Sequence, residues 1–447
     1  MKDMKKEKII YGVGQLSITF LASFIGSSII FYYDAYLGME NLDLIGNAFL
    51  IYTIWNFLND PLFGNISDRT THRLGRRIPY LRYGAIPISI IFLLIWLPPI
   101  NFSDQGLFIY LLIMLLLFDT LYTIVGVSFF SLLPLLTLNE KERASYSKFA
   151  MIFSIVGIAL SYLIPIGTGT QSSFILLITI TTILSCGGIL LVSFQLKEKY
   201  GPREKTQIKL KESLVACLKD TNFLIYVVVM FGLTFFRYII TGGIVYFFKI
   251  ITFQNNTTFI FAFLIILPIL GVLVYYIIGL NEKIGLYKTF LIGLALMLCG
   301  LLLLFFFPFG PIPLSLPSMV LLLLFFITAL GGFIIYMMYE NTLLGRIVDA
   351  DELIMNERRE GMFFGTKNFI TKPANSLGIF YLTRLLGVYL IDSTSPSATS
   401  LNSMKIILFG WPIFVVSLCL IIFLKFPLKG EKLVEIKKLV RKKHKKN

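Results

Sequence analysis

The sequence predicts an all-α polytopic membrane protein with twelve transmembrane helices in two pseudo-symmetric bundles of six. Of its 447 residues, 56% are hydrophobic and 15% are charged, which is not the composition of a water-soluble globular protein. Apolar residues form unbroken runs, and the run at 319–339 can cross a bilayer as one helix. Charge-free stretches of this length also argue against a membrane β-barrel, whose strands alternate polar and apolar residues over ~10 positions.

Twelve apolar segments account for the predicted spans, and several exceed the ~20 residues that one crossing requires, which indicates tilt or helical extension beyond the lipid. The approximate limits are 9–37, 42–66, 80–99, 106–134, 148–169, 172–196, 221–248, 258–280, 288–308, 316–345, 361–391 and 404–427. The first segment follows a basic start and has no small-residue cleavage site, so we interpret it as a retained span and not a signal peptide.

The basic residues predict the orientation of these spans. Lys and Arg total 40 against 25 Asp and Glu, and most of the 40 fall in the terminal segments and in every second loop. The intervening loops hold almost none, which predicts a multi-pass cell-membrane protein with both termini cytoplasmic. The net charge of +15 therefore reflects topology, and the bilayer, not a nucleic acid, is the predicted macromolecular partner.

The longest polar stretch between spans divides the chain into equal halves. We predict an N-terminal bundle at 1–196, a cytoplasmic linker at 197–220, a C-terminal bundle at 221–427 and a basic cytoplasmic tail at 428–447. Transporters built from two such halves bind their substrate near the midplane between them.

Charged loops at matching places in the two halves predict a cytoplasmic gate. The loops at 64–77 and 279–288 each begin with Gly and soon present an acidic–basic pair, and those at 139–148 and 349–361 each carry a Glu–Arg pair. The alternative is that these charges are solvated and serve only to orient the spans in the membrane. Orientation requires basic residues alone, whereas these loops also contain acidic residues between the basic ones. The gate prediction comprises Asp68, Arg69, Arg76, Arg77, Glu142, Arg143, Asp351, Arg358 and Arg359.

The 64–77 loop also carries a resemblance to a known family. Gly64, Asp68, Arg69 and the run 75–77 are similar to the major facilitator superfamily loop G-x-x-x-D-R-x-G-R-R, with four extra residues before Gly75. Together with 55–70 and 349–378, they resemble the glycoside–pentoside–hexuronide:cation symporters, of which the melibiose permease is the best-known member. The resemblance covers nearly the whole chain and implies the major facilitator fold and secondary active transport.

Polar residues inside the spans indicate a coupling site. Thr53 and Asn56 share a helix face with Asp60, and Asn59 borders it. An ionisable group in lipid costs at least ~2.5–3.5 kcal/mol, so Asp60 needs a partner or a function. The resemblance implies that Asp60, Asn59 and Thr123 occupy cation-site positions and that Lys372 faces them. The alternative to this coupling role is an ion pair between Asp60 and Lys372 that is only structural.

Departures from the family concern both the cation and the substrate. Asn56 and Gly126 stand where the family has aspartates, Thr19 replaces a sugar-binding aspartate, Phe130 replaces a tryptophan, and Lys148 stands at an expected arginine. These residues other than Asn56, together with Asn368 on the helix face of Lys372, form the predicted substrate site. With one carboxylate at the coupling site, H+ is preferred as the coupling ion, and Na+ at Asp60 is the alternative.

The sequence thus predicts a monomeric, cation-coupled transporter of a small glycoside-like solute that works by alternating access. It contains no ATP-binding G-x-x-x-x-G-K-[ST] loop, no organic cofactor is implied, and no metal centre other than a Na+ site is predicted. The sequence also lacks a histidine-rich site or a nucleophile motif, so no enzymatic activity is predicted. A lysolipid transporter of the same fold and a non-transporting sensor or scaffold remain the alternatives.

Overall fold

All regular secondary structure in the described part of the chain is helical, as predicted. The computed structural model describes residues 2–70, 72–99, 102–137, 140–198, 217–251, 286–307, 316–355, 360–388 and 398–428, with short pieces between 269 and 285. The helices are α1 (Lys2–Ala35), α2 (Asp43–Arg69), α3 (Ile78–Ile95), α4 (Asp104–Phe130), α5 (Leu133–Leu136), α6 (Glu140–Gly167), α7 (Gln171–Gln195), α9 (Thr221–Ile251), α11 (Leu286–Phe306), α12 (Leu316–Met355), α13 (Glu360–Val388), α14 (Ala398–Lys405) and α15 (Trp411–Leu424).

Nine helices within these described ranges are long and apolar enough to cross a membrane. Of the twelve predicted spans, 258–280 lies largely outside the described residues. The other two, 42–66 and 361–391, form the helices α2 and α13, with 27 and 29 residues. These two helices carry most of the predicted coupling residues.

Two helices differ from the predicted spans in ways that their sequences explain. The predicted span 106–134 ends as α4 at Phe130, and the short α5 follows with Pro134 in its first turn. Proline tolerates a helix start but lacks the N–H that a continuous helix would need there. In contrast, α12 has 40 residues, about 60 Å at 1.5 Å per residue, and so extends well beyond the hydrocarbon layer.

The chain forms two compact units. The first comprises Met1–Lys205, Thr241–Ile250 and Ile379–Ser395, and the second comprises Thr206–Ile240, Ile251–Gly378 and Pro396–Asn447. The predicted boundaries of the two bundles, the linker and the tail stay a prediction.

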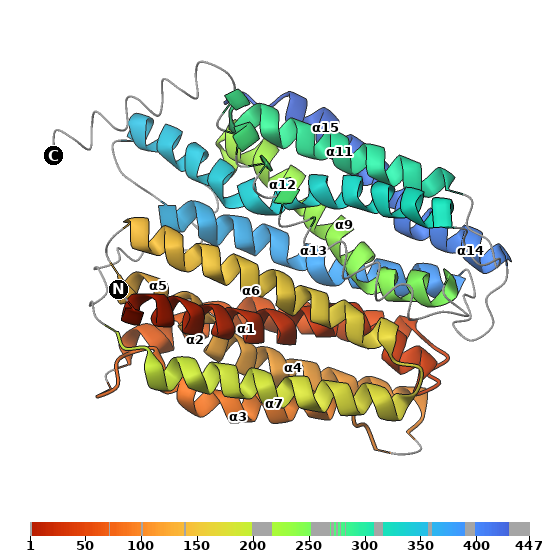
Figure 1. Ribbon diagram of the computed structural model, residues 1–447, viewed down its shortest axis with the longest axis horizontal. Helices are drawn as coiled ribbons and strands as arrows, with labels where there is room; N and C mark the ends of the chain where they lie inside the picture. The colour runs from red at the N-terminus through yellow and green to blue at the C-terminus, as the bar shows by residue number, and fades with distance from the viewer. Residues whose placement is uncertain are drawn as a thin grey trace. The chain divides into compact units, whose positions relative to one another are not determined.

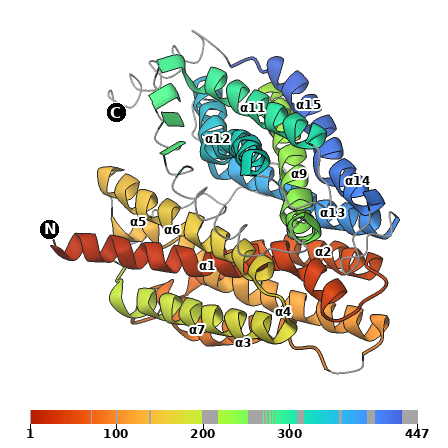
Figure 2. The ribbon, with the colours of Figure 1, turned by 45° about the vertical axis from the view of Figure 1, so that its right-hand side comes forward.

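In the first unit α1 packs on α6 and α7, while α4 packs on α2 and α3 (Figure 1). Helices α3 and α7 also pack on each other (Figure 2). A buried aromatic cluster joins α1, α3 and α7, in which the Tyr32 ring stacks on Phe174 and the Tyr32 hydroxyl donates to the carbonyl of Trp96. The aromatic run at 31–33 is thus buried packing.

In the second unit α11 packs between α12 and α15 (Figure 1), and glycines allow α11 and α12 to approach closely. A Cβ atom on Gly332 would lie 2.3 Å from the carbonyl oxygen of Gly293, and one on Gly300 would lie 2.4 Å from the backbone nitrogen of Ala329. Small residues at such crossings bring helices into van der Waals contact, which drives helix association in lipid.

Replacement of Gly332 by Ala is therefore expected to destabilise the second unit by about 1–3 kcal/mol, because backbone atoms must move apart to admit the methyl group. The matched control is Gly331→Ala on the same helix, where the nearest atom to an added Cβ is 3.9 Å away. Thermal unfolding in detergent should show a lower Tm for the first variant only. Equal Tm values would show that the crossing adjusts without cost.

Candidate functional site

A buried carboxylate on α4 is the centre of a polar cluster in the first unit. Asp119 is 1% exposed, and its Oδ1 accepts hydrogen bonds from the Tyr52 hydroxyl at 3.0 Å and from Asn56 Nδ2 at 2.5 Å. Its Oδ2 accepts a hydrogen bond from Asn59 Nδ2 at 2.8 Å. Asn59 Nδ2 also donates to Thr123 Oγ1 at 3.1 Å, so five side chains form one network.

Helical spacing explains why two segments some 60 residues apart meet here. Tyr52, Asn56 and Asn59 follow the i, i+4, i+7 pattern and so share one face of α2. Asp119 and Thr123 are four residues apart and share a face of α4, which packs on α2. The packing of these faces of α2 and α4 on each other therefore places the polar side chains together.

Three donors from neutral groups point at the two oxygens of the Asp119 carboxylate, which is the acceptor in all three hydrogen bonds. Oδ1 of the fully buried Asn59 has no hydrogen-bond partner among the described residues, so the cluster holds one unsatisfied oxygen acceptor. A proton or a small cation would meet both the carboxylate charge and this acceptor.

The structure brings together Asn56, Asn59 and Thr123, three of the predicted coupling residues. Asp60 lies in α2, but its side chain is outside the described residues, and so the predicted encounter with Lys372 stays a prediction. Asp119 is the residue that sequence reasoning did not assign. Its position one turn before Thr123 was the available signal, because residues four apart share a helix face.

Four of the predicted substrate residues lie in the first unit and one in the second. Thr19 Oγ1 accepts from Gln15 Nε2 at 3.0 Å and lies 3.1 Å from the hydroxyl of Ser154. Gly126 is buried, with Tyr122 and Phe130 nearest to an added Cβ, whereas Phe130 is half exposed. Lys148 is exposed on α6, and Asn368 lines a cavity of the second unit. Their common role in substrate binding stays a prediction.

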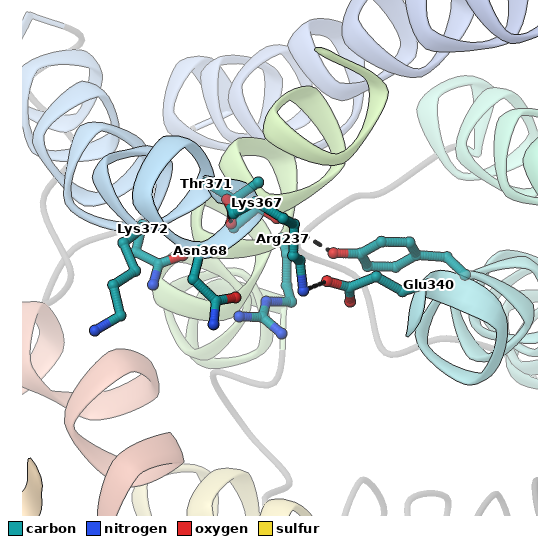
Figure 3. Close-up of a pocket in the computed structure, with 9 residues that line it drawn as sticks. Arg237, Glu340, Lys367, Asn368, Thr371 and Lys372 are labelled. Atoms are coloured by element: carbon teal, nitrogen blue, oxygen red, sulfur yellow. Dashed lines mark hydrogen bonds and ion pairs between the residues drawn. The ribbon is translucent and has the colours of Figure 1, made fainter. Parts of the chain in front are cut away.

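That cavity has a volume of about 160 Å³ and lies between α9, α12 and α13 (Figure 3). Every lining side chain carries a polar atom. The lining residues on α13 are Lys367, Asn368, Thr371, Lys372 and Asn375. Those on the other two helices are Thr234, Arg237, Tyr336 and Glu340.

An ion pair crosses the cavity wall. The Lys367 ammonium binds Glu340 Oε1, and the two side chains are 10% and 18% exposed. Figure 3 shows Lys367 directed from α13 toward Glu340 on α12, with Arg237 beside the pair. From the sequence alone, Glu340 and Arg237 can either line a cavity or pair with each other, because both are charges within spans. In the structure both residues line the cavity, and Glu340 forms its ion pair with Lys367.

Part of the predicted cytoplasmic gate is built around an acidic residue that the sequence analysis left in the linker. The Glu198 carboxylate accepts from the backbone N–H groups of Arg76, Arg77 and Ile78 at 3.0, 2.6 and 3.1 Å. These groups open α3, where a helix N-terminus favours an anion. Gly75 has φ +104, and a Cβ there would lie 2.5 Å from the carboxyl carbon of Glu198, so glycine is required.

The other gate residues are described to different degrees. Glu142 accepts from the Thr137 hydroxyl at 2.5 Å, and Asp351 and Arg77 are buried, which a solvated topology charge would not be. Arg358 and Arg359 lie outside the described residues, as do the side chains of Asp68, Arg69 and Arg143. Closure of a gate by these residues stays a prediction.

Glu198→Gln is expected to lower the free energy of unfolding by about 1–3 kcal/mol, because an amide replaces a charged acceptor that satisfies three backbone N–H groups. Thermal unfolding of the purified protein measures the loss. The control is Glu40→Gln, at an exposed glutamate. Indistinguishable Tm values for the two variants would contradict a structural role for Glu198.

Comparison with known proteins gives this architecture a family. The family model described as MFS/sugar transport protein matches residues 10–430. The chain belongs to that family. It is therefore a multi-pass membrane transporter of small solutes and not an enzyme.

Two relatives illustrate the family, and one solved structure illustrates the fold. The putative glycoside/cation symporter YagG of Escherichia coli is 31% identical over 37% of this chain and 37% of its own length. The isoprimeverose transporter of Lactiplantibacillus pentosus is 25% identical over 67% of this chain and 64% of its own length, so each match spans less than two thirds of the relative. The inward-open xylose transporter XylE of E. coli superposes with a TM-score of 0.67 at 15% identity, covering 98% of this chain and 99% of XylE, which shows the fold alone.

Proposed function

We propose that this transporter is a symporter that couples the movement of a glycoside-like solute to a cation, by alternating access, and that the cation is H+. The observation that carries the proposal is the buried Asp119 carboxylate held by Tyr52, Asn56 and Asn59. A charge buried within a span is costly to retain and is a functional site by default. A relative whose printed name is putative glycoside/cation symporter supports both the solute class and the coupling.

The geometry favours H+ over Na+. Sodium, like other hard cations, prefers several converging oxygen ligands. Here the amides of Asn56 and Asn59 direct their nitrogens at Asp119, and the unsatisfied Oδ1 of Asn59 adds one oxygen to the carboxylate, which is fewer oxygens than a sodium site needs. A proton needs only one titratable group. Asp60, whose side chain lies outside the described residues, remains part of the proposed coupling site.

Cavity chemistry favours a polar solute over a lysolipid. A lipid carrier needs an apolar cleft, whereas every residue that lines the cavity of the second unit offers a hydrogen-bonding or charged group. Amide and hydroxyl groups at Asn368, Asn375 and Thr371 are suited to sugar hydroxyls. We further propose a monomer in the cell membrane with both termini cytoplasmic, as the distribution of basic residues predicts.

Uptake by proteoliposomes tests the proposal. The panel comprises neutral and acidic glycosides and a lysophosphatidylcholine, each with an imposed inward H+ or Na+ gradient. The expected result is accumulation of a sugar driven by the H+ gradient and abolished by a protonophore. Accumulation driven only by Na+ would reverse the ion assignment. Transport of the lysolipid alone, or of nothing in the panel, would overturn the proposed function.

A further inference from the structure

An apolar face of the first unit is open to its surroundings. Helices α3 and α7 pack on each other, and each exposes a row of large apolar side chains at helical spacing. These rows include Ile86, Ile90 and Leu94 on α3 and Ile180, Leu184 and Leu191 on α7, each at least 37% exposed. In a membrane protein such a face contacts the acyl chains of lipids.

A basic and aromatic corner lies at one end of this face, where α3 begins and α7 ends. The Arg82 guanidinium donates from Nη2 to the carbonyl of Ser193 at 2.8 Å and lies 4.2 Å from the centroid of the Phe194 ring. Phe194 and Tyr83 are 59% and 65% exposed. Lys197, two residues past the end of α7, is also exposed. Exposed aromatic rings beside basic residues are typical of the level of the lipid headgroups.

The cations of this corner are not neutralised by the described part of the chain. Among those residues, no carboxylate lies within ion-pair distance of Arg82 or Lys197, and Arg82 makes a single hydrogen bond, from Nη2. The neighbouring acid, Glu198, is already held by three backbone N–H groups at the start of α3. An anion from outside the chain can therefore meet two positive charges here.

The length of the apolar face agrees with one leaflet of a bilayer. From Tyr83 to Leu94 the helix α3 rises about 16 Å at 1.5 Å per residue. Half of the hydrocarbon core is roughly 15 Å thick. A lipid whose acyl chain lies along this row thus places its headgroup at the level of Arg82.

The second unit has a similar arrangement where α11 begins and α15 ends. The Tyr287 hydroxyl donates to the carbonyl of Leu424 at 3.4 Å, and the Tyr287 ring stacks on Phe423. Lys288 and Lys425, which follow these residues in the sequence, are exposed. Each unit therefore joins the ends of two helices through a polar donor, an aromatic ring and nearby cations, but a tyrosine takes the place that an arginine has in the first unit.

We propose that the corner formed by Arg82 and Lys197 binds the phosphate of an anionic phospholipid in the cytoplasmic leaflet, with the acyl chains along α3 and α7. The fork of N–H donors on arginine matches two phosphate oxygens, and the lysine adds a second charge. Basic sites between membrane helices on the cytoplasmic side recognise such headgroups. The inference rests on the proposed cytoplasmic orientation of this end of α3 and is independent of the transported solute.

Lipid binding to the full-length protein in detergent tests the proposal. Native mass spectrometry compares phosphatidylglycerol with phosphatidylcholine of the same acyl chains, so that only the headgroup differs. We expect phosphatidylglycerol to bind about tenfold more tightly, because two cations without a carboxylate partner attract it. Arg82→Gln and Lys197→Gln should each lower this ratio to about threefold, and Arg82→Lys should retain most of it.

The matched control is Arg73→Gln, at an exposed arginine in the loop before α3, which should keep the wild-type ratio. Lys197→Gln guards against a folding defect, because Lys197 is exposed and has no hydrogen bond or ion pair with a described residue. An unchanged ratio in both glutamine variants would mean that Arg82 only caps the end of α7, and would overturn the proposal.

Two further outcomes with the wild-type protein would also overturn it. The first is equal binding of the two lipids. The second is displacement of phosphatidylglycerol by an equal concentration of glycerol phosphate, which would assign the corner to a free phosphate and not to a lipid. Neither outcome affects the proposed transport function, because lipid binding is measured without a solute or a gradient.

Discussion

Asp119→Asn is expected to abolish accumulation of the solute against its gradient while solute exchange across the membrane continues. Asparagine has the size and shape of aspartate but can neither take up a proton nor neutralise a cation. The H+ or cation gradient can therefore no longer drive solute accumulation through this position. Exchange of labelled for unlabelled solute needs only alternating access and therefore persists. The two assays in the same proteoliposomes separate loss of coupling from loss of transport.

A matched control exists on the same helix. Asp104 at the start of α4 accepts a hydrogen bond from the backbone N–H of Asn41 at 2.8 Å, and Asp104→Asn retains an oxygen for that bond. This variant should accumulate solute like the wild type. Full accumulation by Asp119→Asn would show that its carboxylate is structural. If Asp60→Asn then failed to accumulate, coupling would lie with the residue that the sequence indicated.

Features that depend on neighbouring residues in the sequence can be predicted from it, whereas features that depend on contacts between distant helices cannot. The spans were predictable because hydrophobicity and length are local properties that the bilayer imposes. The position of Asn56 and Asn59 on the same side of α2 was predictable for the same reason, since helical periodicity is local. The family resemblance added Thr123, which α4 supplies.

The missed residues depend on contacts between helices. Asp119 acquires its role from three donors on α2, and nothing in the neighbourhood of residue 119 specifies them. Glu198 looked like one charge in a polar linker, but it satisfies three N–H groups of a loop some 120 residues earlier. Likewise, Glu340 could be recognised as a costly intramembrane charge, whereas the choice of Lys367 as its partner required the packing of α12 and α13.

The pairing of Glu340 with Lys367 predicts that replacing either residue alone causes a large loss of stability and that replacing both restores most of it. Glu340→Gln leaves the Lys367 ammonium in a cavity that already holds Arg237 and Lys372, without its counter-ion. Removing one partner of a buried pair costs about 3–5 kcal/mol, because the remaining charge stays desolvated and unpaired. Lys367→Met should cost a similar amount by leaving the carboxylate alone.

The double variant Glu340→Gln with Lys367→Met is expected to regain most of the loss, because neither charge then remains to be compensated, and neutral replacements of similar size are often no less stable than a buried pair. Thermal unfolding of the four proteins gives the coupling between the two positions. Asp43→Asn is the control: Asp43 pairs with Arg384, but the side chains are 29% and 52% exposed, so a loss of no more than about 1 kcal/mol is expected. Additive losses in the double variant would mean that the two side chains stabilise the protein independently and that their ion pair contributes no coupling energy.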